Sequence, residues 1–297
     1  MSLPASALDF WQRLGEPPPD ALVDARLQLH WAAQIPASVG YTYLDPVPDW
    51  SHVSLSWHAD GCVLASGPTP GDAPCRAALR PADLTLLLLD AHNVAVAAFP
   101  LDGRTLNEGY SWLATVLAEH SGGALNEPLV RPDHEMPPHP VGDGGAFSRT
   151  PAPAFAEMAR WFADAHLLLE AVRAVEPAAS PVRCWPHHFD LAVLLTLDPD
   201  AAPEKARSIG VGMEPGDGSY AEPYWYVTPW PYPEHPTLPP LDGGGHWHTE
   251  GWTGAVLTAR ALVGEGRAAA QTRRVSDFVT SALAAAHRLV GAQTHEP

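Results

Sequence analysis

The chain has 297 residues, and 17 Lys and Arg side chains against 34 Asp and Glu side chains give it a formal net charge of −17. This length predicts one or two domains whose core is large enough to fold without disulfides or a structural metal. The acidic charge excludes the basic, phosphate-binding surface that nucleic-acid-binding proteins use. A hydrophobic content of 46% excludes a chain that is disordered throughout.

Cysteine content and hydrophobic run lengths indicate the compartment. The chain has three cysteines, an odd and sparse set that favours a reducing compartment over a secreted disulfide framework. Residues 1–20 lack the basic and apolar pattern of a signal peptide. The leucine-rich run of residues 84–89 is far shorter than the about 20 residues that span a bilayer. We therefore expect a cytoplasmic protein with no membrane or nucleic-acid partner, and the oligomeric state stays open.

The signatures of common enzyme classes are missing. Lys205 is the only lysine and lies in a charged, proline-containing segment, which disfavours a Schiff-base enzyme. The glycine-rich nucleotide-binding motifs and the G-x-S-x-G hydrolase motif are absent. The sequence therefore predicts no nucleotide cofactor.

In the first half of the chain, glycine and proline separate the predicted elements. A helix is expected over residues 5–14, strands over 26–33, 53–57, 78–90 and 94–99, and a helix over 106–120. Thr105 and Glu108 have the spacing of a capping box in front of that last helix, and Gly122 and Gly123 are suited to end it. Residues 126–153 contain seven prolines, which exclude a helix or a central strand there.

In the second half, Pro151 follows Thr150 as the first-turn proline of the clearest helix. Its apolar stripe consists of Phe155, Met158, Phe162, Ala165, Leu169 and Val172. Strands are expected over 182–197, 208–213 and 224–227, and a last helix over 273–290. The chain is thus predicted as α+β, with largely antiparallel sheets and three or four amphipathic helices. Two similar halves, 1–125 and 154–297, would be joined by the connector 126–153; one compact domain, or an internal duplication, is the alternative.

The most unusual segment places His246, His248 and Glu250 two residues apart after three glycines. On a strand these side chains would share one face. Two imidazoles and a carboxylate are a suitable ligand set for zinc or iron(II). The sequence therefore predicts one divalent metal here, with His139 from the connector as a further ligand. The alternative is a polar strand edge with solvated histidines.

Three further polar residues are candidates for catalysis. His188 and Asp190 would face the same side of a strand, where the carboxylate could orient the imidazole as a general base. Glu222 is flanked by proline, so its carboxylate would be held still, and we consider it a second candidate base. A satisfied polar pair at the end of the sheet is the alternative reading of His188 and Asp190.

Aromatic residues gather in the same part of the sequence. Tyr224 and Tyr226 alternate with Trp225 and Val227, so at least one of the two faces should be core. A ligand-binding wall would consist of Tyr224, Tyr226, Trp230 and Trp252.

Several motifs resemble a bacterial family that is defined only as a domain of unknown function. They are Trp185-Pro186-x-His188-Phe189-Asp190, Pro215-Gly216-Asp217 and Glu222-Pro223-Tyr224-x-Tyr226-Val227-x-Pro229-Trp230. The resemblance covers most of the chain and implies no activity. It does imply that His139, His188, Asp190 and Glu222 belong to the pattern of the family, whereas the His246-x-His248-x-Glu250 segment belongs to a subset of members.

Three functions fit these observations. The first is a metal-dependent enzyme that acts on a small molecule. The second is a non-catalytic protein that binds a small, sugar-like ligand on a Trp and Tyr wall. The third is a structural protein whose polar motifs only hold its loops.

Overall fold

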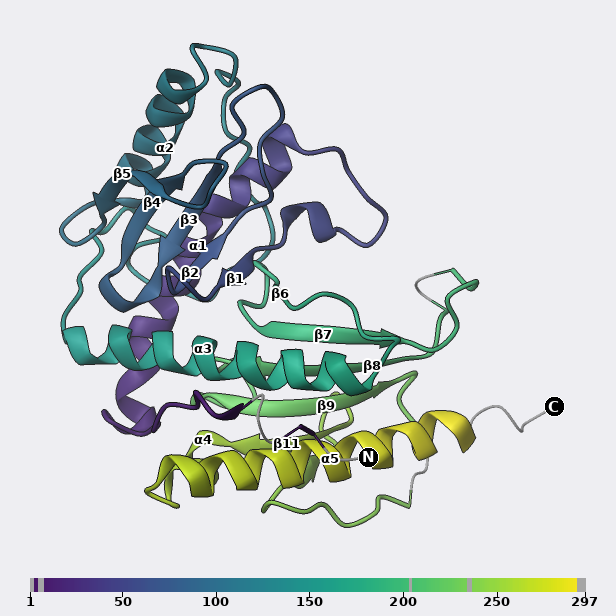
Figure 1. Ribbon diagram of the computed structural model, residues 1–297. Helices are drawn as coiled ribbons and strands as arrows, with labels where there is room; N and C mark the ends of the chain where they lie inside the picture. The colour runs from purple at the N-terminus through teal and green to yellow at the C-terminus, as the bar shows by residue number, and fades with distance from the viewer. Residues whose placement is uncertain (1–2, 5–7, 203–204, 234–236, 293–297) are drawn as a thin grey trace. The chain divides into compact units, whose positions relative to one another are not determined.

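A computed structural model describes residues 3–4, 8–202, 205–233 and 237–292 (Figure 1). It contains helices and two antiparallel sheets, which confirms the α+β class. The chain divides into two compact units. The first unit comprises residues 21–159 and 183–189, and the second comprises residues 1–20, 160–182 and 190–297. The long helix α3 (Ala152–Val175) begins in the first unit and continues in the second.

The first unit is a five-stranded antiparallel sheet in the order β1-β2-β3-β4-β5, with two helices on one face. Its elements are α1 (Val23–Tyr43), β1 (Ser56–His58), β2 (Val63–Ala65), β3 (Arg76–Arg80), β4 (Thr85–Leu89), β5 (Ala95–Pro100), α2 (Leu106–His120) and β6 (Arg183–Cys184). Helix α2 begins with the predicted capping box of Thr105 and Glu108. Leu86 faces the helices, since a Cβ atom on Gly109 of α2 would lie 3.4 Å from its side chain and 2.6 Å from that of Ile35 in α1.

Helix α1 corrects the prediction of a strand over residues 26–33. Apolar and polar residues alternate in this segment and so imitate a strand, but Gln28, His30 and Gln34 are buried. Each of them is hydrogen-bonded, and Gln34 donates to the carbonyl groups of His30 and Pro186. The helix therefore buries polar as well as apolar positions, which hides its period of 3.6 residues.

Other predicted strands are interrupted by turns. The expected strand 78–90 is divided between β3 and β4 by a 3₁₀ turn, Pro81–Asp83, and by Leu84 in a left-handed conformation. A proline in a strand pattern marks such a break. The predicted helix over 5–14 is not formed at residues 11–14, and residues 5–7 lie outside the described residues.

The second unit is built on the sheet order β10-β11-β9-β8-β7. Its strands are β7 (Leu191–Thr196), β8 (Ser208–Glu214), β9 (Tyr224–Trp230), β10 (His246–His248) and β11 (Gly254–Thr258), and its helices are α4 (Ala259–Val263), α5 (Ala268–Ala292) and most of α3. The six apolar residues of the predicted α3 stripe are buried.

The two faces of this second sheet differ in chemistry. Trp225 and Val227 of β9 are completely buried, and Trp225 packs 6.0 Å from Trp11. Helix α5 packs against β9, β8 and β11, and in Figure 1 α3 and α5 cross the same side of the sheet. The opposite face carries Tyr226 in a row with Ala192, Gly212, Val256 and His246 from the other four strands. We call it the Tyr226 face.

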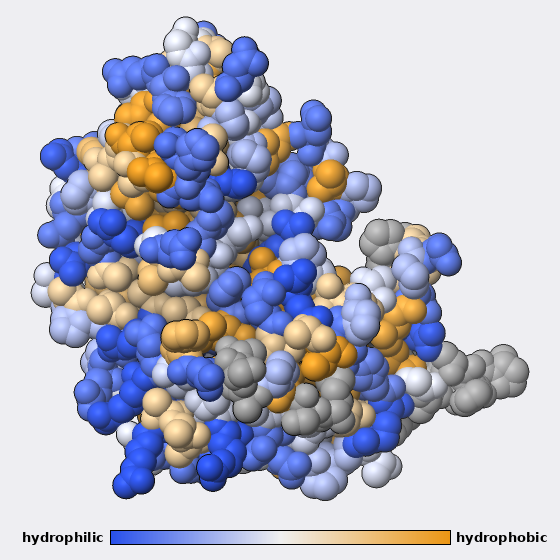
Figure 2. Space-filling model, viewed as in Figure 1, coloured by the Kyte–Doolittle hydropathy of each residue, from blue (hydrophilic) through white to orange (hydrophobic). Residues whose placement is uncertain are grey.

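No described helix is both long and apolar enough to cross a membrane. On the side that Figure 2 shows, hydrophobic residues form several separate patches among hydrophilic ones. Exposed apolar residues scattered in this way are normal for a protein surface and need no partner to explain them.

Candidate functional site

Two residues of the predicted metal site, His246 and His248, lie at the edge of the Tyr226 face. His246 and His248 are the two ends of β10, and their side chains point to the same face, as strand geometry predicts. The hydroxyl group of Tyr220, from the turn before β9, lies 3.0 Å from Nε2 of His246 and 3.1 Å from Nδ1 of His248. One phenol group therefore connects both imidazoles.

The carbonyl of Glu250 determines which atom donates in each hydrogen bond between His246, Tyr220 and His248. Nε2 of His248 lies 2.8 Å from the backbone carbonyl of Glu250, and a carbonyl can only accept, so this nitrogen carries the proton. Nδ1 of His248 then accepts from the Tyr220 hydroxyl, whose oxygen accepts in turn from Nε2 of His246. Partial burial and the neighbouring His248 lower the pKa of His246.

Trp252 extends the site along the sheet. Its ring stacks on His248 with the centroids 4.4 Å apart, and its indole N–H donates to Ser219. The ring lies directly over Gly254 of β11, because a Cβ atom there would be 2.3 Å from the indole. Glycine at this position thus lets the tryptophan lie flat against the sheet.

Asp217 holds the turn that carries Tyr220. One of its carboxylate oxygens accepts hydrogen bonds from the backbone N–H groups of Ser219 and Tyr220. The other oxygen accepts from the hydroxyl of Tyr224, whose ring lies 4.9 Å from that of Tyr220. Asp217 belongs to the Pro215-Gly216-Asp217 motif of the sequence, and the turn it forms is what brings Tyr220 to β10.

Tyr226 occupies the centre of the same face. Its hydroxyl donates to Asp190 over 2.5 Å, and burial together with this carboxylate holds the pKa of Tyr226 well above its usual value. The ring lies over Gly212 of β8, where a Cβ atom would be 2.5 Å from the hydroxyl oxygen. Asp190 thus supports a tyrosine, which is a contact that the sequence pattern did not predict.

The metal ligands predicted from the sequence do not form a complete set in this structure. Among the described residues, no three His, Cys, Asp or Glu side chains are arranged to hold a metal ion. Glu250 lies beyond the end of β10, and its backbone carbonyl accepts from His248. The imidazole nitrogens of His246 and His248 that face each other are engaged by Tyr220.

Glu222 and Trp230, which the sequence also predicts as site residues, lie apart from the group around Tyr220. One carboxylate oxygen of Glu222 accepts from the backbone N–H of Arg260 at 2.6 Å, in the first turn of α4. A carboxylate at this position stabilises the start of the helix. Trp230 is 43% exposed at the far end of β9, where it contacts Tyr232 edge-on. The predicted aromatic wall therefore consists of separate pieces, of which Tyr224, Tyr226 and Trp252 lie towards the Tyr220 end.

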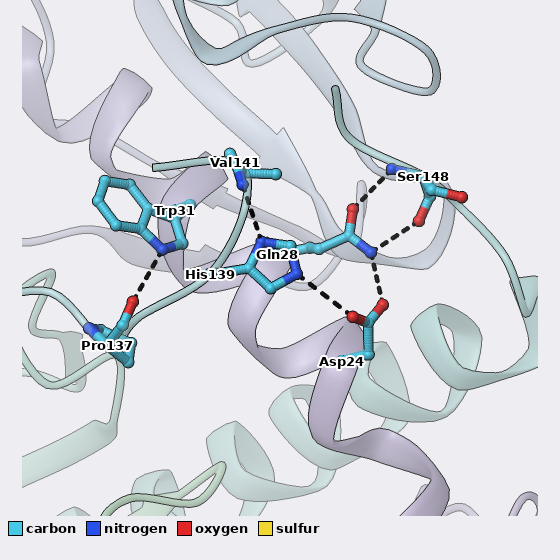
Figure 3. A network of polar contacts seen from close by, with 7 residues as sticks. All are labelled: Asp24, Gln28, Trp31, Pro137, His139, Val141 and Ser148. Carbon is cyan, nitrogen blue, oxygen red and sulfur yellow. Dashed lines mark hydrogen bonds and ion pairs between the residues drawn. The ribbon is translucent and has the colours of Figure 1, made fainter. Parts of the chain in front are cut away.

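His139 belongs to a polar network of the first unit that Figure 3 shows. Its Nδ1 accepts from the backbone N–H of Val141, and its Nε2 lies 3.3 Å from Asp24 of α1. Asp24 also accepts from Gln28, which exchanges two hydrogen bonds with the backbone of Ser148. Both ring nitrogens of His139 are thus engaged, and its Nε2 attaches the proline-rich connector to α1.

His188 lies on an exposed turn of the first unit, with its ring 4.1 Å from that of His187. The turn is closed by hydrogen bonds from the backbone N–H groups of His188 and Phe189 to the carbonyl of Trp185. Phe189 has a φ of 70°, which is strained for a side chain of this size, and stacks on His30. Histidines 30, 134, 187 and 188 interact electrostatically around this turn.

No family model, no curated protein and no solved structure matches the chain.

Proposed function

We propose that the protein binds a small, neutral, hydroxylated ligand of the sugar type on the Tyr226 face of its second unit. The observation that carries this proposal is the group formed by Tyr220, His246, His248 and Trp252, in which the rings are held by one another and by hydrogen bonds. Sugar recognition combines a flat aromatic surface for the C–H face of the ring with polar groups that orient its hydroxyls.

The surface supplies both kinds of contact. Tyr220 and Trp252 are partly exposed, and His246 is exposed. On the same face, Gly212 lies under the ring of Tyr226 and Gly254 under that of Trp252, which lets both rings pack close to the sheet. With Nε2 of His246 donating to Tyr220, Nδ1 of this exposed imidazole can accept a hydrogen bond from a ligand hydroxyl, which suits a neutral polyol. The net charge of −17 also favours a neutral ligand over a polyanion.

The metal-dependent enzyme suggested by the sequence would need a further ligand beside His246 and His248. Since the described residues provide no such group, the binding function has the stronger support. Of the aromatic wall predicted from the sequence, Tyr226 and Trp252 belong to the proposed binding surface. Tyr220 is a further member of this surface.

Substitution of Trp252 by alanine should weaken sugar binding by about tenfold, which corresponds to about 1.4 kcal/mol of lost stacking contact. Saturation-transfer difference NMR with glucose, galactose, N-acetylglucosamine, maltose and cellobiose measures this effect on the full chain. The matched control is Trp50→Ala, because Trp50 is 61% exposed and belongs to the first unit.

The variant Tyr220→Phe keeps the ring and removes the hydroxyl that connects the two histidines, so it tests the polar half of the site without opening a cavity. We expect it to weaken binding of the same sugar while the far-UV spectrum is unchanged. The proposal fails if no sugar of the panel binds, or if Trp252→Ala and Trp50→Ala bind it equally well.

A further inference from the structure

A second candidate site lies on the first unit, on the sheet face that carries Val63, Ala65, Ala78, Leu87 and Leu89. These five residues form a buried apolar cluster. They point away from α1 and α2, because Leu86, which faces the helices, alternates with Leu87 along β4. We call this the Leu87 face.

The Leu87 face contains a cavity of about 270 Å³. Its floor is aliphatic and is formed by Val63, Leu87, Leu89 and Ala95. Its polar lining includes His58, Asp60, Arg80 and Asn93. Since a protein cavity of about 150 Å³ accepts benzene, this volume suits a molecule somewhat larger than benzene.

Strand pairing places the polar groups along the length of the cavity. Arg80 at the end of β3 pairs with Thr85, and Val63 begins β2 directly after the turn that contains Asp60. His58, the last residue of β1, pairs with Val63. The side chains of His58, Asp60 and Arg80 therefore belong to one end of the sheet. Asn93 belongs to the turn after Leu89, at the opposite end of β4.

Arg80 is oriented by a neighbour that does not line the cavity. Its Nε and Nη2 atoms donate to the two carboxylate oxygens of Asp83 at 2.8 and 2.6 Å. These two hydrogen bonds fix the plane of the guanidinium group, and its Nη1 atom takes no part in them. Arg80 lines the cavity whereas Asp83 does not. Asp60 is the carboxylate among the lining residues.

We propose that this cavity binds an α-amino acid with an apolar side chain. Arg80 would hold the carboxylate of the ligand, and Asp60 its ammonium group. The side chain would lie along Val63, Leu87 and Leu89 towards Asn93. An apolar α-amino acid carries both of its charges at one end and an apolar side chain at the other. This matches a cavity with charged residues at one end and an aliphatic floor beside them, and the cavity volume fits the size of leucine or phenylalanine.

Calorimetric titration of the full chain with leucine, 4-methylpentanoate and 3-methylbutylamine tests the assignment. The two analogues keep the branched side chain and each lacks one charged group. We expect leucine to bind at least about tenfold more tightly than either analogue. Asp60→Asn should remove the preference for leucine over 4-methylpentanoate, since only the ammonium group distinguishes these two ligands. Equal binding of leucine and 4-methylpentanoate by the unaltered protein would overturn the proposal.

Ala95→Trp provides a second test, because Ala95 lies on the exposed edge strand β5 and a bulky side chain there fills the cavity without entering the core. Val94→Trp is its matched control, since Val94 is 58% exposed and does not line the cavity. We expect the first variant to lose leucine binding and the second to retain it. Failure of leucine and phenylalanine to bind, or equal binding by the two variants, contradicts the assignment. Neither result bears on sugar binding by the second unit.

Discussion

Replacing Gly212 by alanine is expected to destabilise the second unit by about 2 kcal/mol and to abolish ligand binding on the Tyr226 face. A Cβ atom at this position would lie 2.5 Å from the hydroxyl oxygen and 2.6 Å from Cζ of Tyr226. The ring would have to move, and its hydrogen bond to Asp190 would be broken inside the protein. A buried carboxylate such as Asp190 keeps the cost of its desolvation when it loses a hydrogen bond.

The matched control is Gly210→Ala, two residues away on the same strand and the same face. Its Cβ atom would meet Cγ2 of Thr228 at 3.1 Å, so we expect a loss below about 1 kcal/mol. Urea unfolding of both variants measures the difference. In a Tyr226→Val background the cost of Gly212→Ala should fall by more than half. Equal losses for the two glycine variants would show that Tyr226 does not lie over Gly212.

Acidification is expected to destabilise the first unit through His30. This histidine is buried in α1, and its Nε2 donates to the carbonyl of Pro186 at 2.8 Å. Burial lowers its pKa from 6.5 to about 4, with smaller contributions from His134, Arg26 and His188. The unfolded chain therefore takes up a proton near pH 6.5, whereas the folded chain does not until about pH 4. Stability is complete above pH 6.5 and falls by about 3 kcal/mol as the pH decreases to about 4.

The variant His30→Gln separates this contribution from that of other groups, because the amide can still donate to Pro186 and does not titrate. Urea titrations at about pH 7 and about pH 4.5 should show a clearly smaller loss for this variant than for the unaltered chain. His92→Gln, in an exposed turn, is the control and should retain the full loss. An unchanged pH dependence in His30→Gln would exclude His30 as the source.

The fold could be predicted from the sequence where local signals agreed with the tertiary structure. The capping box of Thr105, the stripe of α3 and the buried positions Trp225 and Val227 are examples. Helix α1 could not, because its buried face includes His30 and Gln34, whose partner Pro186 is more than 150 residues away. The sequence shows the polar residue but not the carbonyl that satisfies it.

In the candidate site, too, the features that depend on neighbouring residues could be predicted, whereas contacts between distant residues could not. Strand periodicity placed His246 and His248 on one face correctly, since it depends only on neighbouring residues. Tyr220, which connects them, lies in a turn 26 residues before His246, and nothing in its local sequence marks it as a partner. Gly212 and Gly254 were also not recognised, because a glycine in a strand has meaning only once the ring above it is known.

Contact between a neutral hydroxylated ligand and the rings connected by Tyr220 should be visible in long-range ¹H–¹⁵N NMR spectra of the histidine rings. These spectra are recorded while the best sugar of the panel is titrated into the full chain. We predict that the imidazole signals of His246 and His248 shift together and saturate, and that the signals of His52 and His92 in the first unit do not move. Saturable binding that leaves the signals of His246 and His248 unchanged would place the sugar elsewhere on the protein and exclude the Tyr220 site.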